Sequence, residues 1–395
     1  MIDSRRPAWL RTKFSSADRE ASPPDSGVTH AHGKFTTRNI SAGRPVRVLL
    51  VCHLFILAYR ALRCAQAAGA TVIVLGNDGS KGFRFSLFCE RFVPSSVSFD
   101  GSIHGGIASE INRVAAEFDI DIVMPGDAPS TRSMIGVREK LQVQTFPLPD
   151  LGTFDLLNDK WQFAELCRHL GIGHPRSCLV ERRVDLSPRI SANTLTFPLV
   201  AKPLSLNGGE GVTVIHSRDV PHVEHRVFYE PILLQDYIDG IDIGASVYCR
   251  SGTICAWIMH KILRATYITF HDEAILSDIR KIVEQLRLDG IFNFDMRMSK
   301  AGNVYFLECN PRVFYKMNLS MLAGINFVGL GLIGSRECGS ISIPPGTNVR
   351  MPKALMASLM TPWRLTRRDV AMLSHLYSDP IRYLRELLSI DWEPY

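Results

Sequence analysis

The sequence of 395 residues lacks a long uninterrupted apolar run. Its longest apolar stretches, Val48–Ala58 and Leu322–Gly334, are broken by His53 in the first and by Asn326 and glycines in the second. A membrane-spanning helix needs about 20 consecutive apolar residues, so neither stretch predicts one. The first ten residues also lack the apolar segment of a secretory signal. We therefore expect no membrane partner and a cytoplasmic location.

Paired cysteines are also missing. Nine cysteines are scattered from Cys52 to Cys338, and no two of them stand in a CxxC spacing. This pattern argues against a disulfide framework and against a zinc site. We expect most of the cysteines to be small buried apolar residues.

A basic stripe with interleaved aromatic residues is absent as well. The formal net charge is +6, but residues 1–46 hold eight Lys/Arg and four Asp/Glu, which leaves the remainder nearly neutral. We therefore expect no nucleic-acid partner. Residues 1–45 are rich in Ser, Pro and Gly without periodicity, and they predict a disordered leader.

Buried-strand and helix patterns alternate from Val46 onward. The strand candidate Val46–Val51, the helix candidate Ile56–Ala68 and the strand candidate Thr71–Leu75 form a β-α-β unit, which predicts a parallel sheet. The helix pattern Ile107–Phe118 and the strand pattern Ile120–Pro125 repeat the unit. The first strand is followed by His-Leu-Phe rather than by GxGxxG, so a dinucleotide-binding dehydrogenase loses its main support.

The pattern changes after Leu157, where a helix candidate, Asp159–Leu170, precedes shorter β-rich segments. An amphipathic helix is expected at Glu273–Leu286. The candidate strands are Leu199–Lys202, Val212–Ile215, Ile232–Tyr237, Ile243–Cys249, Thr253–Met259, Phe292–Met298 and Val304–Cys309. The fold class expected is α/β plus α+β: a doubly wound parallel-sheet domain followed by a lobe dominated by antiparallel pairs. The expected boundaries are 1–45 for the leader, 46–150 and 151–335 for the two domains, and 336–395 for a C-terminal helical extension.

Oxygen ligands cluster on the predicted hairpin Phe292–Arg312. Alternation places Asp295 on the first strand and Glu308 and Asn310 on one face of the second. Mg²⁺ prefers such oxygens and completes its shell with water and phosphate, so the hairpin predicts a metal–nucleotide site. Arg312 follows as a bidentate donor for an anion. The alternative is a solvated hairpin face with unremarkable acids.

Two further elements suit a nucleotide. A strand ending in Lys202 leads into a glycine-rich turn containing Ser205, Gly208, Gly209 and Gly211, whose N–H groups can cover phosphates. It is not a Walker A motif, because no GK[ST] precedes a helix, and a plain hairpin loop is the alternative.

An extended segment, whose backbone can pair with an adenine edge, holds Gln235, Asp236, Tyr237 and Ile238. Asp242 stands where a carboxylate could hold ribose hydroxyls, with an edge strand as the alternative. Lys160 lies in a first helical turn, where lysines are usually solvated.

In order and spacing these elements resemble the ATP-grasp superfamily, and most closely its branch around carbamoyl-phosphate synthase large chains, biotin carboxylases and D-alanine ligases. The resemblance covers roughly residues 46–335, with its strong motifs within 157–315. Phe197–Pro203 resembles the family's nucleotide-lysine strand, and Glu308–Arg312 resembles its metal-binding end. Many relatives have Glu-Lys where Gln-Asp stands at 235–236, and a Glu at 242.

The resemblance implies ATP as cofactor with Mg²⁺, or Mn²⁺ as an alternative metal. It implies that Lys160 and Lys202 bind phosphates under the loop Ser205–Gly211, that Gln235–Ile238 line the adenine, and that Asp242 holds the ribose. Asp295, Glu308 and Asn310 would bind the metal, with Arg312 and Lys202 as catalytic residues.

The expected activity is that of a carboxylate–amine ligase that forms an acyl phosphate from small-molecule substrates and releases ADP and phosphate. A homodimer is compatible with the sequence. One alternative is a bicarbonate-using carboxylase or carbamoyl-phosphate-synthase-like enzyme, although the sequence has no biotin-attachment Met-Lys-Met segment and no glutaminase region. The other is a non-catalytic ATP-binding regulator, against which the complete Asp295, Glu308 and Asn310 set argues.

Overall fold

The computed structural model describes residues 44–192, 195–205, 209–334, 341–358 and 362–379. The predicted leader lies outside these residues except for its last two positions, and Gly208 also lies outside them. Within the described ranges, no helix has both the length and the apolar character needed to cross a membrane.

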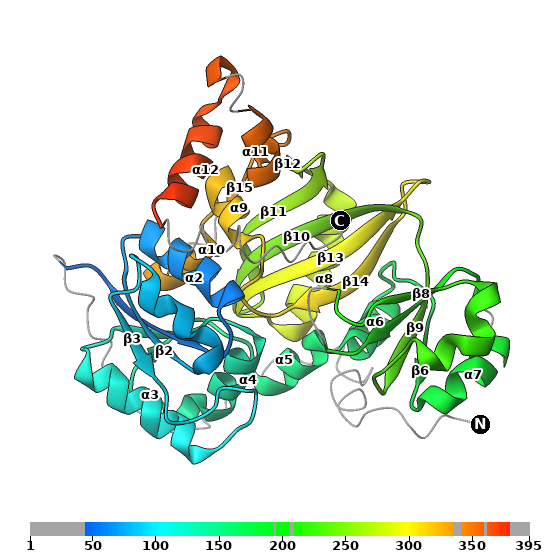
Figure 1. Cartoon of the computed structure of the whole chain (residues 1–395), viewed down its shortest axis with the longest axis horizontal. Helices are drawn as coiled ribbons and strands as arrows, with labels where there is room; N and C mark the ends of the chain where they lie inside the picture. The colour runs from blue at the N-terminus through cyan, green and yellow to red at the C-terminus, as the bar shows by residue number, and fades with distance from the viewer. Residues whose placement is uncertain (1–43, 193–194, 206–208, 335–340, 359–361, 380–395) are drawn as a thin grey trace, which may run out of the picture. The chain divides into compact units, whose positions relative to one another are not determined.

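A parallel sheet follows the start of the described chain (Figure 1). Its strand order among the described residues is β3-β2-β1-β4-β5, and all its pairs are parallel. Helices α2 (Ile56–Ala67), on one face, and α3 (Gly105–Glu117) and α4 (Ala128–Val137), on the other, cover it, and the three central strands have buried side chains on both faces. The strands are β1 (Arg47–Cys52), β2 (Thr71–Gly76), β3 (Arg91–Pro94), β4 (Ile122–Pro125) and β5 (Gln144–Thr145).

The point where the strand order reverses, between β1 and β4, is filled by a side chain of the protein itself. Asp127 is buried and begins α4, where its Oδ1 accepts a hydrogen bond from Ser130 N at 2.8 Å. Its Oδ2 accepts from the backbone N–H groups of His53 and Leu54, at 2.8 and 2.6 Å. Doubly wound sheets usually bind the phosphates of a dinucleotide at this crevice. The carboxylate of Asp127 accepts from the N–H groups that a phosphate would otherwise need, in keeping with the missing GxGxxG motif.

A mainly antiparallel sheet follows in the order β14-β13-β10-β11-β12-β16, with the short strand β15 parallel to β11, as far as the described residues go. Helix α8 (Glu273–Leu286) packs on β11, begins at the capping residue Asp272, and has the bounds predicted from its amphipathic pattern. The strands are β10 (Gly240–Arg250), β11 (Thr253–Leu263), β12 (Thr266–Phe270), β13 (Gly290–Ser299), β14 (Val304–Asn310), β15 (Ile341–Ser342) and β16 (Asn348–Arg350).

A smaller antiparallel sheet has the order β6-β9-β7-β8 and its own apolar core, to which α7 (Leu186–Ala192) contributes Leu186 and Ile190. The chain reaches it through α5 (Leu151–Asn158) and α6 (Lys160–His169). Its strands are β6 (Ser177–Val180), β7 (Leu199–Pro203), β8 (Thr213–Ile215) and β9 (Ile232–Asp236).

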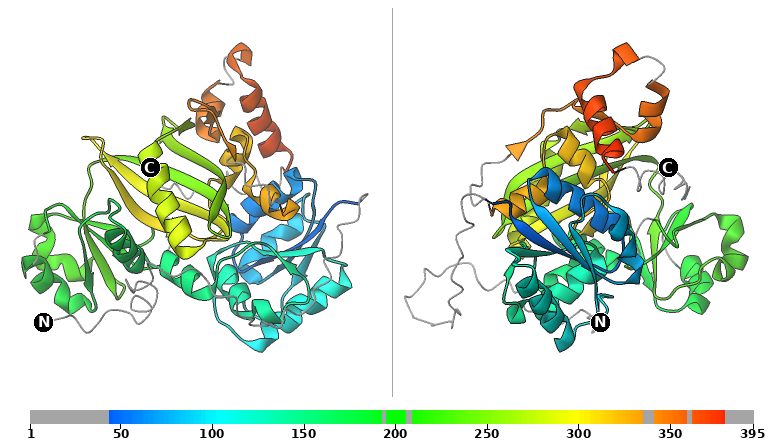
Figure 2. Two further views of the ribbon diagram at one scale, coloured as in Figure 1. Left: turned by 180° about the vertical axis from the view of Figure 1, so that it is seen from behind. Right: turned by 60° about the vertical axis from the view of Figure 1, so that its left-hand side comes forward.

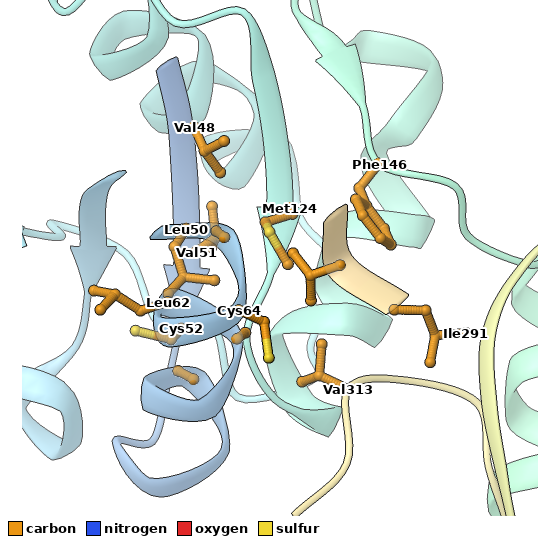
Figure 3. Close-up of a cluster of buried hydrophobic side chains, with 14 of the residues drawn as sticks. Val48, Leu50, Val51, Cys52, Leu62, Cys64, Met124, Phe146, Ile291 and Val313 are labelled. Carbon is orange, nitrogen blue, oxygen red and sulfur yellow. The ribbon is translucent and has the colours of Figure 1, made fainter. Parts of the chain in front are cut away.

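The chain then returns to the parallel sheet. Helix α10 (Phe327–Ile333) lies beside α2 (Figure 2), where Asn326 Nδ2 donates to Cys64 O at 2.7 Å. Figure 3 shows Val313 and Ile291 beside the side chains of the parallel sheet, and these residues belong to one buried cluster. The remaining helices are α9 (Met317–Ala323), α11 (Pro352–Ser358) and α12 (Arg367–Tyr377). The predicted fold class, a parallel-sheet unit followed by antiparallel sheets, is confirmed.

The cysteines are mostly free thiols. Cys52, Cys64, Cys167, Cys249 and Cys309 are free and buried. Cys255, in contrast, is disulfide-bonded. The expectation of small apolar thiols therefore fails at this position.

Candidate nucleotide and metal site

A cavity of about 1280 Å³ opens between the small sheet and one face of the large antiparallel sheet. Small-molecule sites usually measure about 300–1,000 Å³, so this cavity has room for more than one ligand. Of the residues selected from the sequence, its lining includes Lys160, Lys202, Gly209, Gln235, Asp236, Tyr237, Ile238, Asp242, Asp295 and Glu308. Ser205, Gly211, Asn310 and Arg312 are described but are not part of the lining.

The two carboxylates meet because β13 and β14 form the predicted hairpin. Asp295 pairs with Glu308 in the ladder, and the register then shifts so that Met296 pairs with Phe306. Leu307 is therefore an extra residue on β14, a β-bulge, which re-aims neighbouring side chains. Leu307 and Glu308 both line the cavity as a result.

Asn310 lies next to this pair. Its Nδ2 donates to Asp295 Oδ2 at 3.0 Å and to Glu308 Oε1 at 3.4 Å. Its Oδ1 accepts from Arg312 Nη2 at 2.8 Å. In this orientation the amide nitrogen, not the oxygen, faces the carboxylates. Metal ligation by Asn310 remains a prediction that requires the amide to turn over.

The two carboxylates have opposite pKa shifts. Burial, and then the charge of Glu308, raise the pKa of Asp295. Burial also acts to raise the pKa of Glu308, but the nearby charges of Lys160 and Lys202 outweigh it and lower that pKa. As the pH falls, Asp295 therefore takes up a proton before Glu308, which is the carboxylate next to the lysines.

Lys160 is held in the cavity wall by the start of α6. Asp159 caps the helix through Gln162 N at 2.9 Å, and the backbone N–H of Lys160 donates to Leu204 O at 2.9 Å. The Nζ atom lies 3.0 Å from Glu308 Oε2, with 10% of the Lys160 side chain exposed. Lys160 is therefore not a solvated lysine of the kind that is usual in a first helical turn.

Lys202 comes from β7 and reaches the same cavity. Burial lowers its pKa to about 8, although the charge of Glu308 acts in the opposite direction. A cation shielded from water in this way gains strongly from a phosphate ligand.

The glycine-rich turn has the backbone freedom expected of a phosphate cover. Gly209 and Gly211 have φ values of +76° and +75°, which residues other than glycine rarely adopt. Tyr229 Oη donates to Gly211 O at 2.7 Å and fixes the end of the turn. Ser205 is exposed at its beginning.

The segment predicted to face adenine is tied to the small sheet by its side chains. Gln235 is buried and donates through Nε2 to Ser177 Oγ at 2.9 Å. Asp236 pairs with Arg176 at 2.6 Å. These contacts leave the backbone and the Tyr237 and Ile238 side chains to line the cavity.

Arg297 was missed in the sequence but belongs to this group. Its Nη1 lies 3.2 Å from Asp242 Oδ1, and its guanidinium lies over the Tyr237 ring, 5.2 Å from the centroid. Asp242 pairs with Arg297 across β10 and β13. Strand alternation could have identified Arg297 as a residue of this site, because it is two residues from Asp295 on β13 and therefore points to the same face.

Two carboxylates and one amide form the candidate metal site, and within the described ranges no group of three His, Cys, Asp or Glu residues could hold a metal ion. Mg²⁺ is commonly bound by one or two carboxylates together with water and substrate phosphates. Asp295 and Glu308 fit such a shared site, whereas they do not fit a metal bound by protein groups alone.

Comparison with known proteins identifies relatives that share the fold. Residues 228–353 match a family model described as ATP-grasp in the biosynthetic pathway with Ter operon. The biotin carboxylase domain of Hydrogenobacter thermophilus 2-oxoglutarate carboxylase is similar with a TM-score of 0.59 at 18% identity, covering 74% of this chain and 71% of that one. The chain has the ATP-grasp fold. The L-amino acid ligase of Bacillus licheniformis is similar with a TM-score of 0.56 at 18% identity, covering 76% and 78% of the two chains.

A curated relative is much longer than this chain. The arginine-specific carbamoyl phosphate synthase large chain of Geobacillus stearothermophilus is 27% identical over 191 residues, which are 42% of this chain and 18% of the relative. The chain thus matches well under two thirds of that relative's length. The resemblance to the ATP-grasp superfamily drawn from the sequence is confirmed. The Hydrogenobacter structure was determined with MgADP, ADP and bicarbonate.

Proposed function

We propose that this chain is an ATP- and magnesium-dependent ligase that activates a carboxylate as an acyl phosphate and joins it to an amine, releasing ADP and phosphate. One observation carries the proposal: Asp295 and Glu308 face each other inside a cavity that Lys160 and Lys202 also line. Two carboxylates beside two lysines suit a magnesium–triphosphate complex.

The nucleotide would lie along the cavity from the small sheet to the carboxylate pair. Adenine would contact Gln235–Ile238, and the ribose would lie at Asp242. Lys202 and Lys160 would meet the phosphates, with Gly209 and its neighbours above them. Lys160 would then exchange part of its contact with Glu308 for a phosphate oxygen.

Asp295 and Glu308 would hold the magnesium ion, with Asn310 as a third ligand after its amide turns over. When bound, Mg²⁺ supplies positive charge that stabilises the phosphates during transfer. Lys202 adds a second positive charge, which burial makes more effective because little water screens it. Arg312 is buried and close enough to Glu308 and Asp295 for their charges to act on its pKa.

The reaction would proceed in two displacements. An oxygen of the substrate carboxylate attacks the γ-phosphorus, the bond to the β,γ-bridging oxygen breaks, and ADP leaves. The amine nitrogen then attacks the acyl carbon, the acyl C–O bond breaks, phosphate leaves, and the nitrogen loses a proton to solvent. Lys202 and Arg312 would stabilise the charge that develops in these steps.

Nucleotide product analysis tests the proposal. The chain is incubated with MgATP and pools of amino acids, other small carboxylates or bicarbonate, while ADP, AMP and free phosphate are followed. Glu308→Gln should abolish the acid-dependent release, and Glu284→Gln, an exposed residue of α8, should leave it unchanged. Equal amounts of ADP and phosphate support the ligase. ADP without phosphate indicates a kinase, and AMP contradicts the mechanism.

A further inference from the structure

One row of residues crosses the large sheet on the face of the cavity. Glu308 pairs with Asp295, Asp295 with Gly244, and Gly244 with His260. Residues paired in this way point to the same face. Because neighbouring strands lie about 4.8 Å apart, the backbone of His260 is about 10 Å from that of Asp295.

The imidazole of His260 leans over the glycine in this row. A Cβ added to Gly244 would lie 2.5 Å from His260 Cε1, so only glycine leaves room for the ring. His260 is 1% exposed, and its Nδ1 has no hydrogen-bond partner among the described residues. Burial, and then the charge of Lys316, lower its pKa well below the usual value. The ring is therefore a neutral wall of the cavity next to the carboxylate pair.

Lys316 reaches the same place from another element. It immediately precedes α9, in which Ser320 Oγ lies 3.1 Å from Tyr267 Oη. The Tyr267 ring stacks on His260 with centroids 4.4 Å apart. Residues four apart share a helix face, so Lys316 faces the His260 side of the sheet, in agreement with its effect on that imidazole. It is half-buried, lines the cavity, and forms no ion pair with a residue in the described ranges.

The cavity thus has cations on two sides of the carboxylate pair. Lys160 contacts Glu308 on β14, whereas Lys316 lies toward β11. If the phosphates occupy Lys160 and Lys202, an acid that attacks the γ-phosphate in line approaches from the side opposite to ADP. The acid is itself an anion and needs positive charge there to approach a phosphate.

We propose that Lys316 binds the substrate carboxylate and then the carbonyl oxygen of the acyl phosphate, which makes it a substrate-contacting residue for the acid half of the reaction. This inference rests on the proposed function. The neutral His260 ring lines the cavity beside the lysine and suits an uncharged part of the acid, whereas Tyr267 packs on that ring and is not part of the lining.

An ATP derivative acylated on its γ-phosphate tests the position of Lys316. Its acyl group extends beyond the γ-phosphorus as the proposed intermediate does. Deprotonated Nζ attacks the acyl carbon, the C–O bond to the phosphate breaks, an amide forms, and ATP leaves while the nitrogen releases its proton to solvent. Peptide mass spectrometry then identifies each acylated lysine, with and without excess ATP. Lys281, on α8 and paired with Asp278, serves as a lysine outside the cavity whose labelling ATP should not affect.

We expect ATP-protected acylation of Lys316. Protected acylation of only Lys160 or Lys202 would overturn this proposal and leave the proposed function standing. No ATP-protected lysine anywhere would contradict the nucleotide site itself, and the inference with it.

Variants give a second readout. With an acid found by product analysis, Lys316→Gln should raise the KM for the acid about tenfold or more while the Kd for ATP stays within about twofold. Lys316→Arg should recover part of the loss, and Lys281→Gln should behave like the unmodified chain. An unchanged KM in Lys316→Gln, or an equal loss of ATP binding, would overturn the assignment.

Discussion

The Nζ atom of Lys160 lies 3.0 Å from Oε2 of Glu308, which joins the start of α6 to the β14 strand of the large sheet. The lysine neutralises the carboxylate that is proposed to hold magnesium. A triphosphate that brings its own metal ion would compete for both partners. Binding of a magnesium–triphosphate complex would therefore replace this ion pair at least in part.

This ion pair should be measurable in the unliganded protein. Lys160→Met leaves Glu308 beside Asp295 without its nearest cation, so stability should fall. Glu308→Gln in the same background should restore part of the loss, because the uncompensated charge is gone. Urea unfolding of the four proteins of the cycle should give a coupling of about 1–2 kcal/mol. A coupling indistinguishable from zero would mean that the contact contributes nothing.

Nucleotide binding should take up protons near pH 8. Burial lowers the pKa of Lys202 to about 8, so about half of the unliganded chains carry a neutral Lys202 at that pH. A bound phosphate favours the charged form and raises the pKa again, so up to roughly 0.5 proton should be taken up per nucleotide. Affinity should fall as the pH rises above 8 and level off below about pH 6.5, where Lys202 is already charged.

Calorimetry in buffers with different ionisation enthalpies measures this uptake. Lys202→Met should abolish it, whereas Lys281→Met should keep it. Proton release at pH 8, or an uptake that survives in Lys202→Met, would assign the titration to another group.

Much of this site could be predicted from the sequence because local patterns specify it. Alternation along β13 and β14 predicted a cluster of Asp295, Glu308 and Asn310, and the structure pairs Asp295 with Glu308. The amphipathic period gave α8 its bounds. The hairpin turn after β11 could not be predicted, because Arg264 and Ala265 occupy its positive-φ positions, at 48° and 54°, where Asn and Gly are usual. Strand β12 was missed for that reason.

Contacts between segments that lie far apart in the sequence could not be predicted from it either. The burial of Lys160 depends on Leu204 and Glu308, which only the folded chain brings near. The orientation of the Asn310 amide depends on Arg312 in the same way. Lys316 carries no local motif, and its position is set by the packing of Ser320 on Tyr267.

Asp242 should contribute to ATP binding and little to stability. Its side chain is 75% exposed, so its ion pair with Arg297 is well solvated. If it holds the ribose hydroxyls, Asp242→Asn should weaken ATP binding about fivefold, the effect of about 1 kcal/mol. It should leave the affinity for 2′,3′-dideoxy-ATP unchanged, since that nucleotide lacks the hydroxyls. Equal weakening for both nucleotides would place the ribose elsewhere.

Asp379 should hold the end of α12 against the parallel-sheet unit. It is 1% exposed, and it accepts hydrogen bonds from Tyr59 Oη at 2.9 Å, from Ser86 Oγ at 2.5 Å and from Leu87 N at 3.3 Å. Asp379→Ala leaves these donors without their acceptor, at a cost of about 3 kcal/mol. Hydrogen exchange should speed up in α12 and α2. The matched change Asp278→Ala, at a partly exposed ion pair, should cost less than about 1 kcal/mol. Equal effects of the two changes would show that Asp379 does not anchor the helix.

Transfer of oxygen from the acid to phosphate tests the central claim most directly. An acid identified by product analysis is labelled with ¹⁸O in its carboxylate and incubated with MgATP and the amine, and the released phosphate is analysed by mass spectrometry. Attack of the carboxylate on the γ-phosphorus predicts one ¹⁸O atom in each phosphate released with product. Phosphate without label, or label in AMP, would contradict an acyl phosphate and the ligase mechanism built on Asp295 and Glu308.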